Sequence, residues 1–206
     1  MNALHRWQRG VLLGLVRLIV GGSARYDAPL PDGQCVVFAN HSSHLDTLVL
    51  LAAMPAFRRD RMRPVAGLDY WGATPLRRYI ATRLLNVVMI DRAAGGAASL
   101  QPLHEALAAG DSLIVFPEGT RRAEALPGPF KAGLFHLTQG KPAIALIPAY
   151  LENMHRALPK GAPVPLPLLC RVRIGTAQAP AAPDEDKATF LERLHRAVCQ
   201  LSEVPQ

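Results

Sequence analysis

The fold of this 206-residue chain is decided by one stretch, Cys35-Val36-Val37-Phe38-Ala39-Asn40-His41-Ser42-Ser43-His44-Leu45-Asp46. Its first five residues form an unbroken apolar run, which is typical of a strand buried on both faces of a sheet. The apolar residues between positions 45 and 51 predict a helix packed against that strand. His41 therefore lies where a strand passes into a helix, at the edge of a sheet, which is where α/β folds bind their ligands.

His41 and Asp46 have the chemistry of a proton acceptor and of the group that orients it. Histidine is the side chain best suited to accept a proton near neutral pH, and a neighbouring aspartate fixes its tautomer and stabilises the imidazolium. On one ideal helix, five positions turn through about 500°, which would place the two side chains about 140° apart. They can meet only when His41 lies in the loop and Asp46 in the first helical turn. The spacing alone is weak evidence, because such pairs also arise by chance.

Apolar and polar segments alternate over the rest of the chain. After the strand at 35–39 we expect strands over residues 64–67, 86–90, 113–116, 143–150 and 170–175. We expect helices over 2–20, 44–54, 70–84, 97–109, 130–137 and 185–201, with the aromatic residues of 70–84 in the core. A turn over 29–33 should precede the first strand, and the proline-rich segment 159–167 should have no regular structure. Strands that alternate with helices predict a single α/β domain.

Three polar segments follow predicted strands directly, around His41, Arg92 and Glu118. The carboxyl ends of such strands meet at one edge of a sheet, so these segments should line one crevice. The chain has no Gly-x-Ser-x-Gly elbow, no cysteine beside His41 and no phosphate-binding glycine loop. A nucleophile supplied by the substrate is therefore favoured over a covalent enzyme intermediate.

Several blocks of this sequence, in their order and rough spacing, resemble the signature of the glycerolipid acyltransferases, the 1-acylglycerol-3-phosphate acyltransferase family. They are Asn40-His41 with Asp46, Asn86-Val87-Val88-Met89-Ile90-Asp91-Arg92, Phe116-Pro117-Glu118-Gly119-Thr120-Arg121, Phe130-Lys131-Ala132-Gly133 and Leu146-Ile147-Pro148-Ala149. The resemblance covers most of residues 35–150. Two positions depart from the family pattern, Arg122 where a serine is more frequent and Asn86 where a glycine is common. These departures put the acceptor headgroup in question more than the reaction.

The resemblance implies a mixed, mostly parallel sheet flanked by helices and an acyl transfer to the free hydroxyl of lysophosphatidate, giving phosphatidate. His41 would be the general base and Asp46 would orient it. The acceptor's phosphate and glycerol would be held by Arg92, Glu118, Gly119, Thr120 and Arg121, and Pro148 would bind the acyl donor or shape the site. The donor would be a thioester of coenzyme A or of acyl carrier protein, with no further cofactor. For Glu118 a structural interpretation also exists, in which its carboxylate bonds backbone amides and closes the turn.

The composition is consistent with an acidic partner. The formal net charge is +7, and most of the positive charge is arginine, whose planar fork suits phosphate. Only 6% of the residues are aromatic and no nucleic-acid motif occurs, so lipid headgroups are favoured over nucleic acid as partners. No metal is expected, because no downstream His or Cys pair would complete a set made of His41, His44 and Asp46. Two alternatives remain open: acylation of another lyso-lipid, and a non-catalytic module that binds lipid or nucleic acid.

Residues 1–22 are expected to form an N-terminal amphipathic helix ending at Gly21-Gly22, and residues 23–206 the acyltransferase domain. The helix either covers the core or lies in the membrane interface with its arginines on lipid phosphates. No apolar run reaches the roughly 20 residues of a membrane span, and three cysteines without paired spacing indicate reduced thiols. We therefore expect a peripheral protein at the cytoplasmic face of the membrane. The charge run at 58–63 is interpreted as a solvated loop rather than a membrane contact. One side of the helix should carry Leu4, Trp7, Val11, Leu15, Leu18 and Ile19, and the other Arg6, Arg9 and Arg17.

Overall fold

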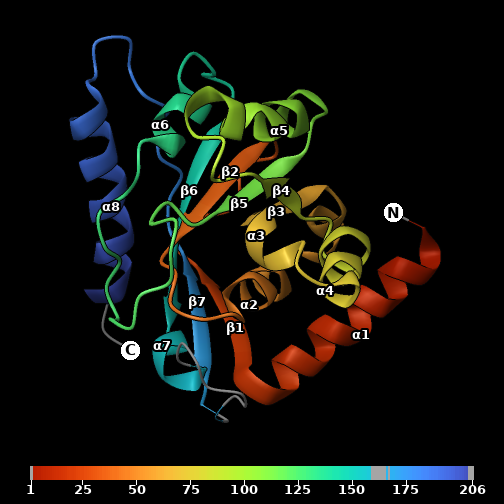
Figure 1. The fold of residues 1–206 in the computed structure, drawn as a ribbon. Helices are drawn as coiled ribbons and strands as arrows, with labels where there is room; N and C mark the ends of the chain where they lie inside the picture. Colours follow the sequence, from red (N-terminus) through yellow and green to blue (C-terminus); the bar gives the residue numbers. More distant parts are fainter. Residues whose placement is uncertain (1, 159–165, 167, 204–206) are drawn as a thin grey trace.

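A seven-stranded sheet in the order β1-β7-β6-β2-β5-β3-β4 forms the centre of the computed structural model, which describes residues 2–158, 166 and 168–203 (Figure 1). All neighbouring strands are parallel except β6 and β7. The mixed, mostly parallel sheet of a single α/β domain is therefore confirmed. The proline-rich segment 159–167 lies almost entirely outside the described residues. The strands are β1 (Gly21–Tyr26), β2 (Cys35–Ala39), β3 (Met62–Gly67), β4 (Val88–Ile90), β5 (Ser112–Val115), β6 (Ala145–Glu152) and β7 (Cys170–Ile174).

Helices cover both faces of the sheet, α1 and α2 on one side and α5, α6 and α8 on the other (Figure 1). Side chains of β2 alternate between the two resulting cores, Val37 on the α2 side and Phe38 on the α8 side. Every residue of β2 is buried, which is why its sequence is continuously apolar. The helical segments are α1 (Ala3–Val20), α2 (Asp46–Ala53), η1 (Ala56–Arg61), α3 (Leu68–Trp71), α4 (Pro75–Tyr79), η2 (Ile80–Leu84), α5 (Gly96–Ala108), α6 (Gly133–Thr138), α7 (Met154–Ala157) and α8 (Lys187–Glu203).

Strand β1 was not predicted, so the expectation that the first strand follows the turn at 29–33 was wrong. It forms the edge of the sheet and pairs in parallel with β7. Ala24 packs against the core on the α2 side, and the Tyr26 hydroxyl donates to the Ala53 carbonyl at 2.8 Å. An edge strand needs only one partly apolar face, and two glycines at its start obscure the alternation that would reveal it.

The helix predicted over 70–84 is divided into three pieces. Helix α3 ends at Gly72, and α4 begins anew with Thr74 as its N-cap and Pro75 in its first turn. A π-helical turn, η2, then completes the segment. A proline that starts a helix removes a backbone donor and interrupts the preceding one.

The charge run at 58–63 belongs to η1 and to the start of β3 rather than to a free loop. The Arg59 guanidinium donates to the carbonyls of Met54 and Ala52, each at 2.9 Å. Arg58 donates to the Pro31 carbonyl. These arginines therefore tie η1 to the end of α2 and to the turn before β2.

Helix α1 is apolar on two opposite sides. Leu13, Val16 and Val20 are buried in the core, while the predicted apolar side faces outward, with Trp7 67% and Leu18 82% exposed. The interpretation that the helix covers the core is thus confirmed for its inner side. Gly21, at φ +77°, ends the helix as expected. No helix of the described residues is both long and apolar enough to span a bilayer.

The arginines of α1 are engaged within the protein. Arg9 is buried, donates to the Arg59 carbonyl at 2.9 Å and pairs with Asp60. Arg17 donates to the carbonyl of Ala52. The expectation that Arg9 reaches lipid phosphates was therefore wrong, because its side chain lies on the buried side of the helix.

Candidate active site

His41 and Asp46 meet between β2 and α2, as the strand-loop-helix pattern predicts. His41 Nδ1 lies 2.8 Å from Asp46 Oδ2. Asp46 is the first residue of α2 and is fully buried. The same carboxylate oxygen accepts hydrogen bonds from the backbone N–H groups of Ser42, at 2.7 Å, and Ser43, at 2.9 Å. A carboxylate oxygen can only accept hydrogen bonds, so the His41 ring proton lies on Nδ1. The other ring nitrogen, Nε2, is therefore free to accept a proton.

The backbone of the His41 loop is held by two neighbouring segments, β6 and the loop after β5. The Asn40 side chain bonds both backbone groups of Leu151 in β6, at 2.7 and 3.2 Å. The His41 N–H donates to Glu118 Oε1 at 2.7 Å, and the His41 carbonyl accepts from the Arg122 N–H at 2.9 Å. The position of the imidazole therefore depends on residues after β5 and in β6 as well as on its own loop.

Glu118 is a support for this loop in the structure. It is buried, and its second oxygen accepts from the Gly128 N–H at 2.8 Å. Burial raises its pKa, and the hydrogen bonds from Gly128 and His41 offset this in part. The side chain is absent from the lining of the cavity beside His41. The structure therefore places the predicted acceptor-binding carboxylate behind the site, in agreement with the structural interpretation of Glu118.

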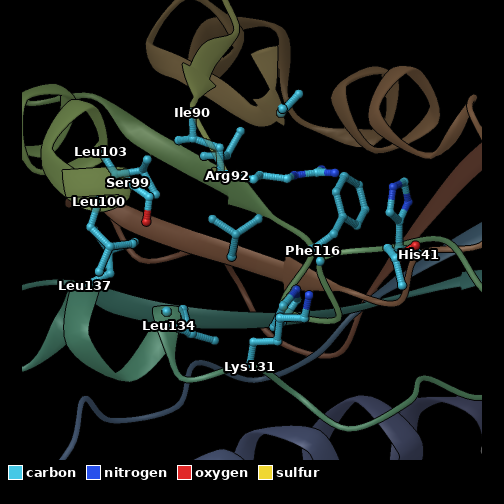
Figure 2. A pocket seen from close by; sticks show the side chains of 18 of the residues that line it. His41, Ile90, Arg92, Ser99, Leu100, Leu103, Phe116, Lys131, Leu134 and Leu137 are labelled. Atoms are coloured by element: carbon cyan, nitrogen blue, oxygen red, sulfur yellow. The ribbon is translucent and has the colours of Figure 1, made fainter. Parts of the chain in front are cut away.

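A cavity of about 980 Å³ opens beside His41 and runs between α5 and α6. Figure 2 shows His41 and Phe116 at one end and the leucines of α5 and α6 at the other. We call the second part the apolar arm. It is lined by Val65, Ile90, Leu100, Leu103, Val115, Leu134 and Leu137.

Three cationic side chains line the part of the cavity near His41. Arg92 is half exposed, lies 4.0 Å from Asp69 and extends toward Phe116 (Figure 2). Arg121 and Lys131 line the same region. The sequence prediction placed Arg92 and Arg121 here, and the structure brings both to the cavity.

The turn after β5 brings backbone and a hydroxyl to the same region. Gly119 has φ +70°, and a Cβ at this position would stand 2.8 Å from Lys131 Nζ. The left-handed backbone favours glycine at this position, and the end of the flexible Lys131 side chain lies in the space that a Cβ would occupy. Thr120, which is exposed, lines the cavity next to it.

Aromatic rings pack against both histidines of the loop. Phe116 stacks on His41 with ring centroids 4.3 Å apart, and Tyr70 stacks on His44 at 5.1 Å. Burial, followed by the positive charge of Arg121, lowers the pKa of His44. Both His44 and Tyr70 line the cavity. The prediction that the aromatics of 70–84 belong to the core was therefore wrong for Tyr70, and also for Tyr79, which is 41% exposed; Trp71 packs against the core and lines the cavity as well. The helical spacing of Tyr70 in the sequence gives no signal of this role.

Pro148 does not reach the cavity. It is buried in β6, opposite Phe38 of β2. Its ring would stand 3.0 Å from a Cβ on Gly175. The sequence predicted that Pro148 either binds the acyl donor or shapes the site. Its position in β6 is compatible only with the second role, exerted indirectly through the central strands.

The two departures from the family pattern also lie outside the cavity lining. Asn86 has φ +54°, a left-handed conformation that asparagine tolerates better than most residues and that glycine adopts freely. The Arg122 side chain pairs with Glu124 at 3.2 Å. Neither residue is among those that line the cavity. Within the described residues, no group of three or more His, Cys, Asp or Glu side chains is placed to hold a metal ion.

The fold and the site together define an α/β protein that presents a histidine–aspartate pair at the mouth of a cavity with an apolar arm. The chain belongs to the acyltransferase family, because the model of that family, described as Acyltransferase, matches residues 23–152. The crystal structure of the 1-acyl-sn-glycerophosphate (LPA) acyltransferase PlsC from Thermotoga maritima has the same fold. It superposes with a TM-score of 0.70 at 20% identity, over 98% of this chain and 81% of that one.

Curated relatives carry related names. The chain is 28% identical over 140 residues to the chloroplastic 1-acyl-sn-glycerol-3-phosphate acyltransferase BAT2 of Brassica napus, covering 65% of this chain. It is 30% identical over 142 residues to the mouse 1-acyl-sn-glycerol-3-phosphate acyltransferase alpha, covering 67% of this chain. The aligned regions span 37% and 46% of the length of these two relatives.

Proposed function

We propose that this protein transfers a fatty acyl group from a thioester donor to the free hydroxyl of lysophosphatidate, giving phosphatidate. The observation that carries the proposal is the His41–Asp46 hydrogen bond at the mouth of a cavity that joins cationic groups to an apolar arm. A phosphorylated lipid needs both kinds of surface. The names of the relatives support the same acceptor.

In the proposed reaction, His41 Nε2 removes the proton from the acceptor hydroxyl as its oxygen bonds to the thioester carbonyl carbon. Asp46 stabilises the imidazolium that forms. The tetrahedral intermediate collapses with cleavage of the carbon–sulfur bond, and the imidazolium returns the proton to the leaving sulfur. The products are an ester and a free thiol, so the balance requires no cofactor beyond the donor.

Arg92, Arg121 and Lys131 are assigned to the acceptor phosphate. Guanidinium groups bind phosphate through paired donors and ammonium groups as point charges. Gly119 and Thr120 would contact the glycerol, since they line the same cavity as these cations and His41. An acyl chain would occupy the apolar arm, whose large aliphatic side chains contribute by the hydrophobic effect.

The outward side of α1 is assigned to the membrane interface at the cytoplasmic face. Leu4, Trp7, Val11, Leu15 and Leu18 are each at least 45% exposed. Each large apolar side chain gains about 1.5–3 kcal/mol when it is fully buried. Because Arg9 and Arg17 are engaged within the protein, we expect attachment to depend more on apolar contact than on charge.

A matrix of acyl donors and acceptors, with products identified by mass, tests the proposal. Donors would be thioesters of coenzyme A and of acyl carrier protein. Acceptors would be lysophosphatidate, other lysophospholipids and lyso-aminolipids. We expect phosphatidate from lysophosphatidate and a loss of turnover of about 10²–10⁴-fold in His41→Ala. Preference for another lyso-lipid would support the alternative acceptor, and near-normal turnover of His41→Ala would exclude the histidine-base mechanism.

A further inference from the structure

Arg121 is a cavity cation without an acidic partner among the described residues. Its Nη1 atom is buried and has no hydrogen-bond partner in this part of the chain. The neighbouring carboxylates are engaged elsewhere: Asp46 by His41, Glu118 by two backbone amides, and Asp69 by Arg92. A buried guanidinium donor without a partner is costly unless a ligand completes it.

What Arg121 contacts is the ring of Tyr70. The guanidinium carbon lies 5.9 Å from the ring centroid, within the range of a cation–π interaction. The ring itself is held by its neighbours. It stacks on His44 at 5.1 Å, meets Trp71 edge-on at 5.5 Å, and lies 4.4 Å from the guanidinium carbon of Arg77.

An aromatic ring and a carboxylate would hold an arginine in different ways. A carboxylate would occupy the N–H donors and would have to be displaced before a phosphate could bind them. A ring attracts the cation through its π face and consumes none of these hydrogen bonds. The donors of Arg121 thus remain available while its position is restrained.

We propose that Tyr70 is a positioning residue that holds Arg121 through its ring, so that the guanidinium donors are free for the acceptor phosphate. This inference rests on the proposed function, since it assigns Arg121 to that phosphate. Tyr70 acts by its aromatic face, so its hydroxyl is not required. Its contribution appears in binding of the phosphorylated acceptor and not in the chemical step.

The test compares Tyr70→Leu with Tyr70→Phe in the full chain. We expect Tyr70→Leu to raise the KM for lysophosphatidate about fivefold to twentyfold, the range for a partly desolvated cation–π contact. Its kcat should change little, and Tyr70→Phe should match the unmodified protein. With monoacylglycerol, which has the hydroxyl but no phosphate, the two variants should behave alike. In an Arg121→Ala background, Tyr70→Leu should have no further effect.

Two further variants separate this role from a merely structural one. Tyr79→Leu removes an aromatic ring from the same segment, outside the cavity lining, and should leave the KM unchanged. Arg77→Gln removes the other cation over the ring and should also leave it nearly unchanged. An increase in KM for Arg77→Gln equal to that for Tyr70→Leu would overturn the inference, because the ring would then act through Arg77.

A binding measurement separates failure of this inference from failure of the proposed function. Calorimetry with sn-glycerol 3-phosphate should show weaker binding to Tyr70→Leu than to Tyr70→Phe, whether or not acyl transfer is observed. Equal binding by the two variants would refute the role of the ring. An unmodified protein that binds this probe but does not acylate lysophosphatidate would refute the proposed function alone.

Discussion

Replacing Asp46 by asparagine tests the charge of the His41–Asp46 pair separately from its geometry. One carboxylate oxygen accepts from His41 Nδ1 and from two backbone N–H groups, at 2.7–2.9 Å. In Asp46→Asn the amide oxygen must take this place, because an amide N–H₂ there would oppose three donors. The tautomer of His41 should therefore be retained, and only the negative charge that stabilises the imidazolium is lost.

The size of this loss follows from the close contact. For charge centres about 4 Å apart at an effective dielectric of about 20, the attraction is about 4 kcal/mol. The neutral hydrogen bond from His41 Nδ1 to the asparagine amide oxygen remains and still contributes about 1 kcal/mol. The net loss of about 3 kcal/mol corresponds to a reduction in kcat of about 10²-fold. A wrong tautomer would cost more, since the same substitution in a serine-protease triad lowers kcat by about 10⁴-fold.

The measurement is steady-state turnover on lysophosphatidate, with thermal unfolding as a control for folding. Asp46 Oδ1 is buried without a hydrogen-bond partner within the described residues, so the new amide donor there should cost about 1–3 kcal/mol of stability. In a His41→Ala background the substitution should lower turnover no further. A kcat within a few-fold of the unmodified protein would refute the assignment of Asp46 to charge stabilisation.

The same geometry gives three further predictions. Glu118→Gln should lower kcat with little change in acceptor KM, because one amide oxygen cannot accept from both backbone donors; a selective rise in KM would restore the acceptor-binding role. Arg121→Lys should recover little of the acceptor KM lost in Arg121→Ala, since an ammonium does not reproduce a bidentate fork; full recovery would show that charge alone suffices. A double Trp7→Ser and Leu18→Ser variant should stay folded but sediment less with anionic liposomes, whereas Leu13→Ala should cost about 2–5 kcal/mol of stability; unchanged sedimentation would move the membrane contact away from α1.

The parts of the fold that could be predicted are those with an unambiguous apolar period. Strand β2 is buried on both faces, and its apolar run is too short for a helix and rich in the valine and phenylalanine that strands favour. Strand β1 could not be predicted in this way, because Ala24 packs against the core while Tyr26 stays exposed and bonds the Ala53 carbonyl only through its hydroxyl. The break between α3 and α4 was visible in Gly72 and Pro75, but the continuing helical spacing of apolar residues outweighed it.

The site was predictable where its chemistry depends on the order of residues along the chain. His41 and Asp46 meet because a loop and a first helical turn bring them together. The sequence left two roles open for the Glu118 carboxylate, and the choice between them depends on amides from His41 and from Gly128, which come from separate loops. Tyr70 reaches the cavity by a turn of α3, and no local pattern records that contact.

The pairing of β1 with β7 has a consequence for the order of events during synthesis. Gly21 pairs with Cys170, so α1 and β1 leave the ribosome about 150 residues before the strand that β1 joins. Chains grow at about 5–20 residues per second, which leaves β1 without this neighbour for roughly 7–30 seconds. During that interval the inner side of α1 can already pack against α2 and β1, whereas its outward apolar side stays exposed. In a nascent chain that contacts a bilayer during this period, α1 binds the membrane before β1 pairs with β7.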